Sequence, residues 1–270
     1  MKIAVAGAAG RMGQMLVREI ARTEGCTLAG ALEGAGNNAI GREAGEVAGV
    51  GNSHRSLKGV KIVADAGAAI GAADAVIDFT VPAATVAHAK IAAEKGVSMV
   101  IGTTGLDPQQ TAAIHAAAQK IPILWAANMS VGINILLALV EKTAAMLDPA
   151  YDIEVMEMHH RHKIDAPSGT ALALGRAAAA GRQVKLEEVW RKSRDGHTGA
   201  RPSGEIGFAT LRGGEEVGVH TVMFAAAGER LELSHRAFSR ETYASGAVRS
   251  ALWLQGKSPG LYGMKDVLGL

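Results

Sequence analysis

Short apolar runs alternate with helix-like stretches through the first 128 residues, and this alternation restricts the fold more than any other feature of the sequence. The apolar runs are Lys2–Ala6, Thr27–Glu33, Ala75–Thr80, Val97–Gly102 and Ile121–Ala126. Helical patterns between them span Arg11–Arg22, a segment from Pro82 to just before Gly96, and Asp107–Lys120. Regular alternation of strands and helices predicts a parallel sheet with helices on both faces, and therefore an α/β fold.

The pattern changes after Asn128. Val131–Leu147 resembles a long helix and Asp152–His159 a strand, and several strand-like runs follow between Ser203 and Ala237 without helices between them. Consecutive strands predict an antiparallel or mixed sheet, and so a second, α+β domain of residues 129–239. Arg240–Leu254 is helical again, and we expect residues 240–270 to return to the first domain, residues 1–128. The Gly- and Asn-rich segment Gly34–Lys58 predicts a loop with at most short helices.

Charge and cysteine usage exclude several classes of protein. The net charge is +2, from 28 basic and 26 acidic residues, which predicts neither nucleic acid nor an anionic membrane as a partner. The longest apolar helix candidate, Val131–Val140, is too short to span a membrane, and the N-terminus lacks the apolar region of a signal peptide. The single cysteine, Cys26, excludes an intrachain disulfide and predicts a packed core thiol in a reducing, cytoplasmic protein.

A glycine-rich turn, "GAAGRMG" (Gly7–Gly13), joins the first strand to the first helix. Glycines there permit a tight turn and let backbone N–H groups approach a pyrophosphate at the helix N-terminus. The spacing is G-x-x-G-x-x-G, so an ordinary strand–helix turn that needs glycine is the alternative. Glu33 closes the second strand 20 residues after Gly13, where an acid accepts hydrogen bonds from an adenosine ribose. Together these features predict a Rossmann-type dinucleotide-binding domain.

Two more strand ends contain glycine, "IGTTG" (Ile101–Gly105) and "AANMSVG" (Ala126–Gly132). Ligands of open parallel sheets lie beyond the carboxyl ends of the strands. Backbone groups of these segments are therefore candidates to hold a nicotinamide ring, with ordinary strand-to-helix turns as the alternative.

His159–Lys163 holds three histidines, an arginine and a lysine. A zinc site of His159, His160 and His162 is disfavoured, because no cysteine joins them and the i, i+4 spacing of a helical pair is absent. A solvated basic loop is a second interpretation. The third is an anion site, because Ser168, Gly169 and Thr170 begin a helix whose N–H groups and dipole favour negative charge. Both features then select a small carboxylate or phosphate.

The stretch "EMHHRHKIDAPSGTA" closely resembles the signature of the 4-hydroxy-tetrahydrodipicolinate reductase (dihydrodipicolinate reductase) family of diaminopimelate and lysine biosynthesis. "VAGAAGRMG", "VIDFT", "VIGTTG", "AANMSVG", "GHTG", "IGFATLRGG", "GVHT" and "GAVRSALWL" extend the resemblance over essentially the whole chain. It implies an NAD(P)H-binding Rossmann domain, an α+β domain that binds a dicarboxylate substrate and assembles a homotetramer, and a cytoplasmic location.

The resemblance also implies roles for individual residues. His159 and Lys163 match the catalytic pair, and the substrate dicarboxylate site matches His160, Lys163, Ser168, Gly169 and Thr170. The cofactor would contact Gly7, Ala8, Ala9, Gly10, Arg11 and Met12 with its pyrophosphate, Glu33 with its ribose, and Gly102, Thr103, Thr104, Ala126, Ala127, Asn128 and Met129 with its nicotinamide. No metal is implied.

Two positions depart from members of the family that favour a 2′-phosphate. Gly34 follows Glu33, and Val81 follows "DFT", where such members have arginine. We therefore expect NADH to bind at least as well as NADPH. Two other functions remain alternatives: a Rossmann dehydrogenase for an amino-acid semialdehyde, which usually needs a nucleophilic cysteine that Cys26 does not match, and an NAD-binding regulator without catalysis, which needs no histidine-rich loop.

Overall fold

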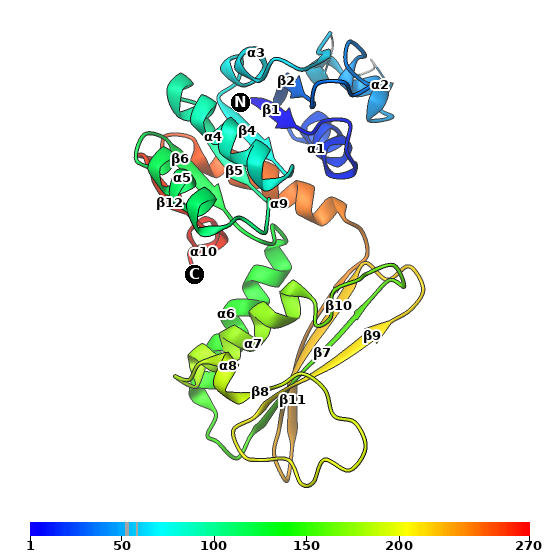
Figure 1. The fold of residues 1–270 in the computed structure, drawn as a ribbon, viewed down its shortest axis with the longest axis vertical. Helices are drawn as coiled ribbons and strands as arrows, with labels where there is room; N and C mark the ends of the chain where they lie inside the picture. Colours follow the sequence, from blue (N-terminus) through cyan, green and yellow to red (C-terminus); the bar gives the residue numbers. More distant parts are fainter. Residues whose placement is uncertain (52–53, 58) are drawn as a thin grey trace. The chain divides into compact units, whose positions relative to one another are not determined.

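The computed structural model describes residues 1–51, 54–57 and 59–270, which form two compact units. The first unit comprises Met1–Val131 and Arg240–Gly269, and the second comprises Gly132–Ser239 with Leu270 (Figure 1). Compared with the expected division after residue 128, the first unit also includes Met129, Ser130 and Val131.

The first unit contains a seven-stranded parallel sheet with the order β12-β6-β5-β4-β1-β2-β3. Its strands are β1 (Lys2–Ala6), β2 (Thr27–Leu32), β3 (Ile62–Val63), β4 (Ala75–Asp78), β5 (Ser98–Ile101), β6 (Pro122–Trp125) and β12 (Gly260–Tyr262). The chain proceeds outward from β1 in one direction through β2 and β3, and in the other through β4, β5 and β6. This reversal beside β1 is the point where open α/β sheets bind ligands, and it confirms the predicted Rossmann-type sheet.

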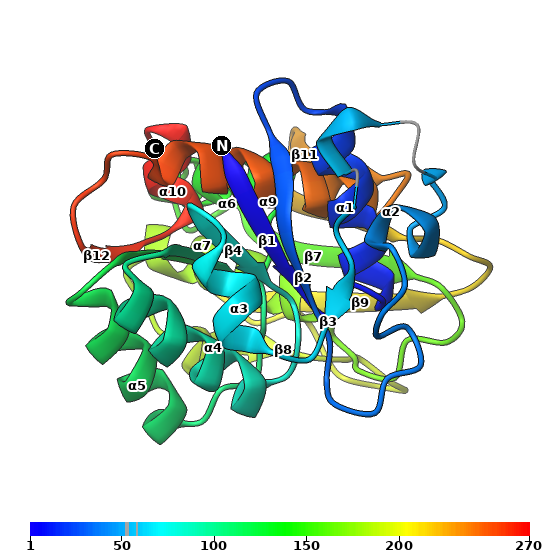
Figure 2. The ribbon, with the colours of Figure 1, turned by 90° about the horizontal axis from the view of Figure 1, so that it is seen from above.

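Helices cover both faces of this sheet (Figure 2). Residues of α1 (Arg11–Arg22), α2 (Ala44–Val47), the 3₁₀ helix η2 (Arg55–Leu57), α9 (Glu241–Leu254) and α10 (Met264–Leu268) pack in one apolar core. Residues of α3 (Ala66–Gly71), α4 (Pro82–Lys95) and α5 (Pro108–Ala118) pack in the other.

Local signals explain where these helices begin and end. Pro82 occupies the first turn of α4, and Gly96 ends that helix in the left-handed conformation (φ 70°). Asp107 and Gln110 form a reciprocal capping box at the start of α5. Both α4 and α5 therefore begin and end within a residue or two of the predicted positions.

The second unit contains the five-stranded mixed sheet β11-β10-β7-β9-β8. Its strands are β7 (Asp152–His159), β8 (Trp190–Arg191), β9 (Ile206–Arg212), β10 (Gly218–Ala225) and β11 (Arg230–Ala237). Residues of α6 (Val131–Met146), α7 (Gly169–Gly181) and α8 (Leu186–Val189) pack against one face of the sheet. The mixed sheet agrees with the prediction of an α+β unit.

Several short elements were not predicted, namely β3, α3, α8, β8, β12 and α10. The expected loop Gly34–Lys58 contains the short helices α2 and η2, in agreement with the prediction of at most short helices; Asn52, Ser53 and Lys58 lie outside the described residues. Cys26 is a buried free thiol, as expected, and burial raises its pKa.

Candidate functional site

Two glycines of the glycine-rich turn disfavour side chains, one through its backbone conformation and the other through close packing. Gly7 adopts φ +69°, and a Cβ atom at Gly13 would lie 2.0 Å from the carbonyl oxygen of Gly7. Gly13 therefore lets α1 start directly against the end of β1. Gly10 precedes α1, and among the described residues no side-chain hydrogen bond caps this helix end. The first N–H groups of α1 consequently lack side-chain acceptors, as an anion-binding helix end requires.

Glu33 lies beside this turn, directly after β2. Its Oε1 accepts a hydrogen bond from the N–H of Ala9 at 2.9 Å, and its Oε2 accepts one from the N–H of Gly34 at 3.2 Å. The carboxylate and the turn therefore form one hydrogen-bonded unit. An acid in this place suits a ribose hydroxyl, and its charge disfavours a 2′-phosphate.

The segments expected to hold the nicotinamide ring, Gly102–Thr104 and Ala126–Met129, follow β5 and β6, and so lie at the carboxyl edge of the same sheet as Gly7. Thr104 and Ala127 are exposed, whereas Thr103 and Met129 are buried. The hydroxyl of Thr103 binds other side chains of the domain, so only its backbone is available to a ligand. Asn128 accepts a hydrogen bond from the N–H of Ser130 at 2.9 Å.

In the second unit, the helix-facing side of the sheet changes from apolar to polar along its strands. On β7, Ile153 and Val155 are followed by Glu157 and His159. The register aligns equivalent changes on the neighbouring strands, from Phe208 to Thr210 and Arg212 on β9, from Val222 to His220 on β10, and from Leu233 to His235 on β11. Polar groups are thus gathered over one end of an otherwise apolar core.

Glu157 is at the centre of this polar cluster and is 1% exposed. Its Oε2 lies 2.5 Å from Nδ1 of His159, and Arg212 donates to both carboxylate oxygens, at 2.8 and 2.9 Å. Its Oε1 also accepts the N–H of Ser168 at 3.0 Å. Burial raises the pKa of Glu157, but the hydrogen bonds from His159, Arg212 and Ser168 outweigh it and lower the pKa to about 2. Glu157 is therefore ionised at neutral pH.

His159 uses only one ring nitrogen in this cluster. Nδ1 binds Glu157, and within the described part of the chain no hydrogen bond engages Nε2. A Cβ atom at Gly218 would lie 3.1 Å from Nε2, so the glycine leaves space beside this nitrogen. A carboxylate on one imidazole nitrogen fixes the orientation of the ring, which leaves the other nitrogen to act on a ligand.

His220 packs edge-on against His159, with 5.0 Å between the ring centroids, and its Nε2 lies 3.2 Å from Oγ of Ser168. Burial, with repulsion from His159 as a smaller cause, lowers the pKa of His220 to about 3. His220 is therefore a neutral partner of the cluster at physiological pH.

The cationic loop, His159–Lys163 at the end of β7, is hydrogen-bonded to the turn between β9 and β10. The N–H of His160 donates to the carbonyl of Glu216 at 2.7 Å, and the N–H of Arg161 donates to Gly214 at 3.2 Å. Lys163 is half-buried, and its Nζ lies 2.8 Å from Oδ1 of Asp165. Asp165 therefore shares the site with Lys163, a neighbour that the sequence analysis did not consider.

The N-terminus of α7 follows this loop. Ser168 is buried and caps the helix, because its Oγ accepts the N–H of Ala171 at 3.1 Å. With its hydroxyl also near His220, the Ser168 side chain serves the domain internally. Gly169 is exposed and Thr170 half-exposed, so these two residues present the helix end to a ligand.

A metal site receives no support. Among the described residues, no group of three or more histidine, cysteine or acidic side chains is placed to hold a metal ion.

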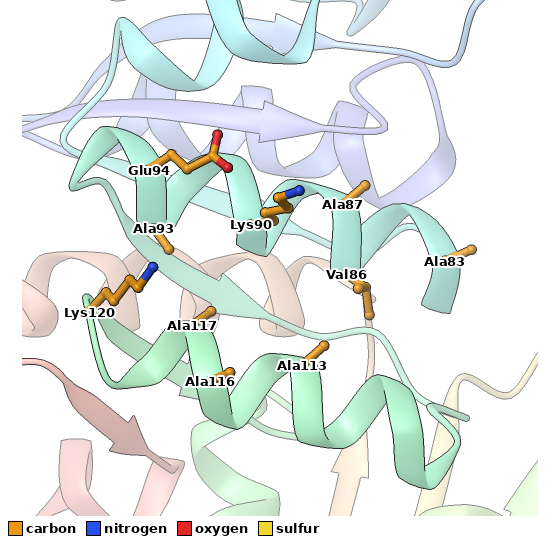
Figure 3. Close-up of a pocket in the computed structure, with 10 residues that line it drawn as sticks. All are labelled: Ala83, Val86, Ala87, Lys90, Ala93, Glu94, Ala113, Ala116, Ala117 and Lys120. Atoms are coloured by element: carbon orange, nitrogen blue, oxygen red, sulfur yellow. The ribbon is translucent and has the colours of Figure 1, made fainter.

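A cleft of about 420 Å³ lies between α4 and α5 (Figure 3). Six alanines and Val86 line most of it, with Lys90, Glu94 and Lys120, and it contains none of the residues proposed from the sequence. No helix in the described parts of the chain is long and apolar enough to cross a membrane.

Glu157, Arg212 and His220 were not predicted from the sequence. Glu157 lies on the same face of β7 as the apolar Ile153 and Val155, because every second residue of the strand is buried. An acid at such an inward-facing position is a signal of a buried ion pair. Arg212 and His220 lie 55 and 63 residues further along the chain, so only the strand register brings them to Glu157.

Comparison with known proteins gives matches to both units. The profile of the dihydrodipicolinate reductase N-terminus matches residues 1–129, and that of the dihydrodipicolinate reductase C-terminus matches residues 132–268. The chain is 54% identical over 270 residues to a 4-hydroxy-tetrahydrodipicolinate reductase of Methylocella silvestris, covering all of this chain and 97% of that protein. It is 52% identical to the same enzyme of Rhodopseudomonas palustris strain BisB5, covering all of this chain and 98% of that protein.

Solved structures share the fold at lower identity. A dipicolinate-bound dihydrodipicolinate reductase from Paenisporosarcina sp. TG-14 matches with a TM-score of 0.75 and 24% identity, over 98% of each chain. An amine dehydrogenase from Mycobacterium smegmatis matches with a TM-score of 0.64 and 14% identity, over 97% of this chain and 94% of that one.

Proposed function

The chain belongs to the dihydrodipicolinate reductase family, and on that premise we propose that it reduces 4-hydroxy-tetrahydrodipicolinate to tetrahydrodipicolinate, with NADH or NADPH, in diaminopimelate and lysine biosynthesis. It is an NAD(P)H-dependent oxidoreductase, as are its curated relatives with identities above 50% over the full chain. That full-length similarity is the observation on which the assignment rests. The histidine-rich loop disfavours a purely NAD-binding regulator, which has no use for it.

The residues of the first unit fit a dinucleotide. The uncapped start of α1 offers N–H groups to a pyrophosphate, and Gly7 and Gly13 keep the turn free of side chains. Glu33 accepts hydrogen bonds from the adenosine ribose, and the backbone of Gly102–Thr104 and Ala126–Met129 holds the nicotinamide. When bound, the cofactor supplies the hydride.

In the second unit, the cationic loop and the N-terminus of α7 bind the two carboxylates of the substrate. His160 and Lys163 contribute positive charge or hydrogen bonds, and Gly169 and Thr170 contribute the helix end. The separate observation that supports this role is geometric: Glu157 binds the N–H of Ser168 on one side and His159 on the other. One buried carboxylate therefore fixes the anion-binding helix end and the candidate acid together.

Reduction of the conjugated imine also requires a proton on carbon. Lys163 is the first candidate donor and His159 the second. Nζ of Lys163 lies 2.8 Å from Oδ1 of Asp165, and Nδ1 of His159 lies 2.5 Å from Oε2 of Glu157, so a carboxylate holds each candidate donor in place. Nε2 of His159, which no hydrogen bond engages among the described residues, would be the atom that delivers or relays the proton.

We propose a cytoplasmic homotetramer. Its support is the face of the second sheet that points away from α6 and α7, where Leu211 is 47% exposed and Met156, Met158 and Met223 are half-buried. A partly apolar sheet face of this kind suits contact with other copies of the chain. Light scattering of the purified protein tests the assembly, and Leu211→Glu should reduce the measured mass.

The activity is tested directly by following nicotinamide absorbance after adding freshly generated 4-hydroxy-tetrahydrodipicolinate to the protein and NADH. Oxidation that depends on both enzyme and substrate supports the proposal. Absence of oxidation with NADH and with NADPH, in protein that binds either cofactor, would contradict it.

A further inference from the structure

Asp78, the last residue of β4, is a carboxylate in the core of the first unit, and its exposed fraction is 0%. It lies between β1 and β5 at the carboxyl edge of the sheet. None of the steps proposed above uses it. A buried ionisable group is costly unless it is well hydrogen-bonded, so its partners indicate what it does.

One oxygen of Asp78 is surrounded by threonines. Oδ1 lies 2.9 Å from the N–H of Thr80 and 2.6, 3.0 and 3.2 Å from the hydroxyls of Thr80, Thr85 and Thr103. The hydroxyls of Thr85 and Thr103 lie 2.8 Å apart. Each hydroxyl has one proton, so the consistent arrangement is a chain in which Thr85 donates to Thr103 and Thr103 donates to Oδ1.

The other oxygen, Oδ2, lies 2.6 Å from Nδ1 of His88 on α4. Burial raises the pKa of Asp78, but the hydrogen bonds from His88 and Thr80 outweigh it, and the pKa is lowered. An ionised carboxylate only accepts hydrogen bonds, so the groups that bind it directly in this arrangement, Thr80, Thr103 and His88, must point a proton toward it. The charge of Asp78 thereby sets the orientation of the hydroxyl of Thr103.

Thr103 is fixed on two sides. Its hydroxyl belongs to the Asp78 network, and its carbonyl accepts a hydrogen bond from Nε1 of Trp125 at 3.1 Å. The preceding Gly102 donates its N–H to the carbonyl of Asp78 at 2.8 Å, and a Cβ atom there would lie 2.1 Å from the ring of Phe79. The chain at Gly102 and Thr103 is therefore attached to β4 through both backbone and side-chain contacts.

We propose that Asp78 and His88 are a positioning pair for the nicotinamide-binding loop, residues 102–104. The ionised Asp78 holds the Thr103 hydroxyl, His88 holds the second oxygen of Asp78, and the loop backbone is thereby preorganised for the nicotinamide ring. This inference rests on the proposed function, which assigns the nicotinamide to that loop. Preorganisation of this kind lowers the cost of ordering the loop when the cofactor binds.

The experiment compares NADH with ADP-ribose, which lacks only the nicotinamide ring, by calorimetric titration of the full chain. Thr103→Val and Asp78→Asn should each weaken NADH about tenfold while ADP-ribose changes much less, since a hydrogen bond to a charged group is lost at the loop alone. His88→Gln should have a smaller effect of the same kind. The turnover number at saturating NADH should fall in all three variants.

Asp65→Ala is the matched control. Asp65 caps α3 in the same domain, where its side chain accepts the N–H of Ala68. Its loss should lower the melting temperature without changing the ratio of the two dissociation constants. If Asp78→Asn does not fold, Thr85→Val and Thr103→Val, which keep the side-chain shape, provide the same comparison.

Equal weakening of NADH and ADP-ribose, or unchanged NADH affinity in both threonine variants, overturns the inference. If the variants give either result but the parent protein still oxidises NADH in the presence of substrate, the proposed function is unaffected. A parent protein that binds NADH but shows no such oxidation contradicts the proposed function instead.

Discussion

Nδ1 of His159 and Oε2 of Glu157 lie 2.5 Å apart on the same face of β7, two residues apart in the chain. Alternation along a strand places both side chains over the polar end of the core. This contact links His159, a candidate acid, to Glu157, and Glu157 also accepts the N–H of Ser168, the residue before α7. The loop with the candidate catalytic residues and the start of α7 are therefore linked through one carboxylate.

Glu157→Gln should reduce the turnover number by about tenfold or more, because the carboxylate that holds Nδ1 of His159 is replaced by a neutral amide. If Glu157 acts through His159, the double variant with His159→Gln should lose no more activity than His159→Gln alone. Steady-state kinetics of the four proteins form the test. Glu154→Gln is the control, since Glu154 is an ion-paired carboxylate on the opposite face of β7. Additive losses would contradict the coupling.

Glu33 and Gly34 should determine the choice of cofactor. We expect NADH to bind at least as well as NADPH, because the carboxylate repels a 2′-phosphate and Gly34 supplies no cation. Gly34→Arg should shift the ratio of affinities toward NADPH, whereas Gly34→Ala should not. A Cβ atom at Gly34 meets no atom of the described residues within 4 Å, so there is open space where either side chain begins. A parent enzyme that clearly prefers NADPH in titrations would refute this prediction.

The proposed anion site, formed by the cationic loop and the N-terminus of α7, should bind a planar pyridine dicarboxylate in competition with substrate. Thr170→Val should weaken this inhibitor by roughly 1–3 kcal/mol, through loss of a hydrogen bond to a charged group. Thr143→Val, within α6, is the matched control and should leave the inhibition constant unchanged. Unchanged inhibition in both Thr170→Val and Lys163→Met would place the substrate elsewhere.

The parts of this structure that local signals determine were predictable from the sequence. Pro82 and Gly96 bracket α4, and the glycines from Gly7 to Gly13 mark the first turn, because those residues restrict the backbone wherever they occur. The short strands β3 and β12 were missed, since two or three residues contain no measurable period.

Contacts that depend on register were not predictable. The sequence suggested an anion site from its cations and helix end, but gave no reason to join Arg212 and His220 to Glu157. That cluster requires β9 and β10 to flank β7 with a particular alignment, which only the folded sheet determines. The ion pair of Lys163 with Asp165 joins residues only two positions apart, but it was not predicted, because only the cations of this loop were considered.

The buried cluster should make the protein less stable in acid. His220 has a pKa of about 3 when folded and 6.5 as its ordinary value, so between these pH values the unfolded chain binds a proton that the native protein does not. Stability is therefore lost as pH falls from 6.5 toward 3, with a slope of up to about 1.4 kcal/mol per pH unit. Glu157 adds a loss in the same direction as pH falls from 4.5 toward about 2.

Urea unfolding at a series of pH values measures this dependence. His220→Gln should flatten the slope between pH 6.5 and 4.5, even if the variant is less stable throughout. His197→Gln, at an exposed loop histidine, should leave the slope as it is in the parent. An identical slope in the parent and in His220→Gln would show that His220 is not the group responsible.

Lys163 should lower the barrier to proton transfer, and its two possible roles separate kinetically. An isolated lysine has a pKa near ~10.4, so an efficient donor near neutrality needs neighbours that adjust it. A role in carboxylate binding alone predicts that Lys163→Met raises KM with nearly unchanged kcat. A role as the acid predicts that kcat falls by about 10²–10⁴-fold in both Lys163→Met and Lys163→Cys, with NADH affinity intact.

Asp165→Asn is the informative companion variant, because it removes the carboxylate 2.8 Å from Nζ of Lys163 and leaves the lysine in place. The hydrogen bond from Lys163 lowers the pKa of Asp165, so the carboxylate of the native pair is ionised. The asparagine should change the pH dependence of kcat without abolishing turnover. If kcat of both lysine variants stays within a few-fold of the parent, Lys163 is not the acid, and the free Nε2 of His159 becomes the donor to test.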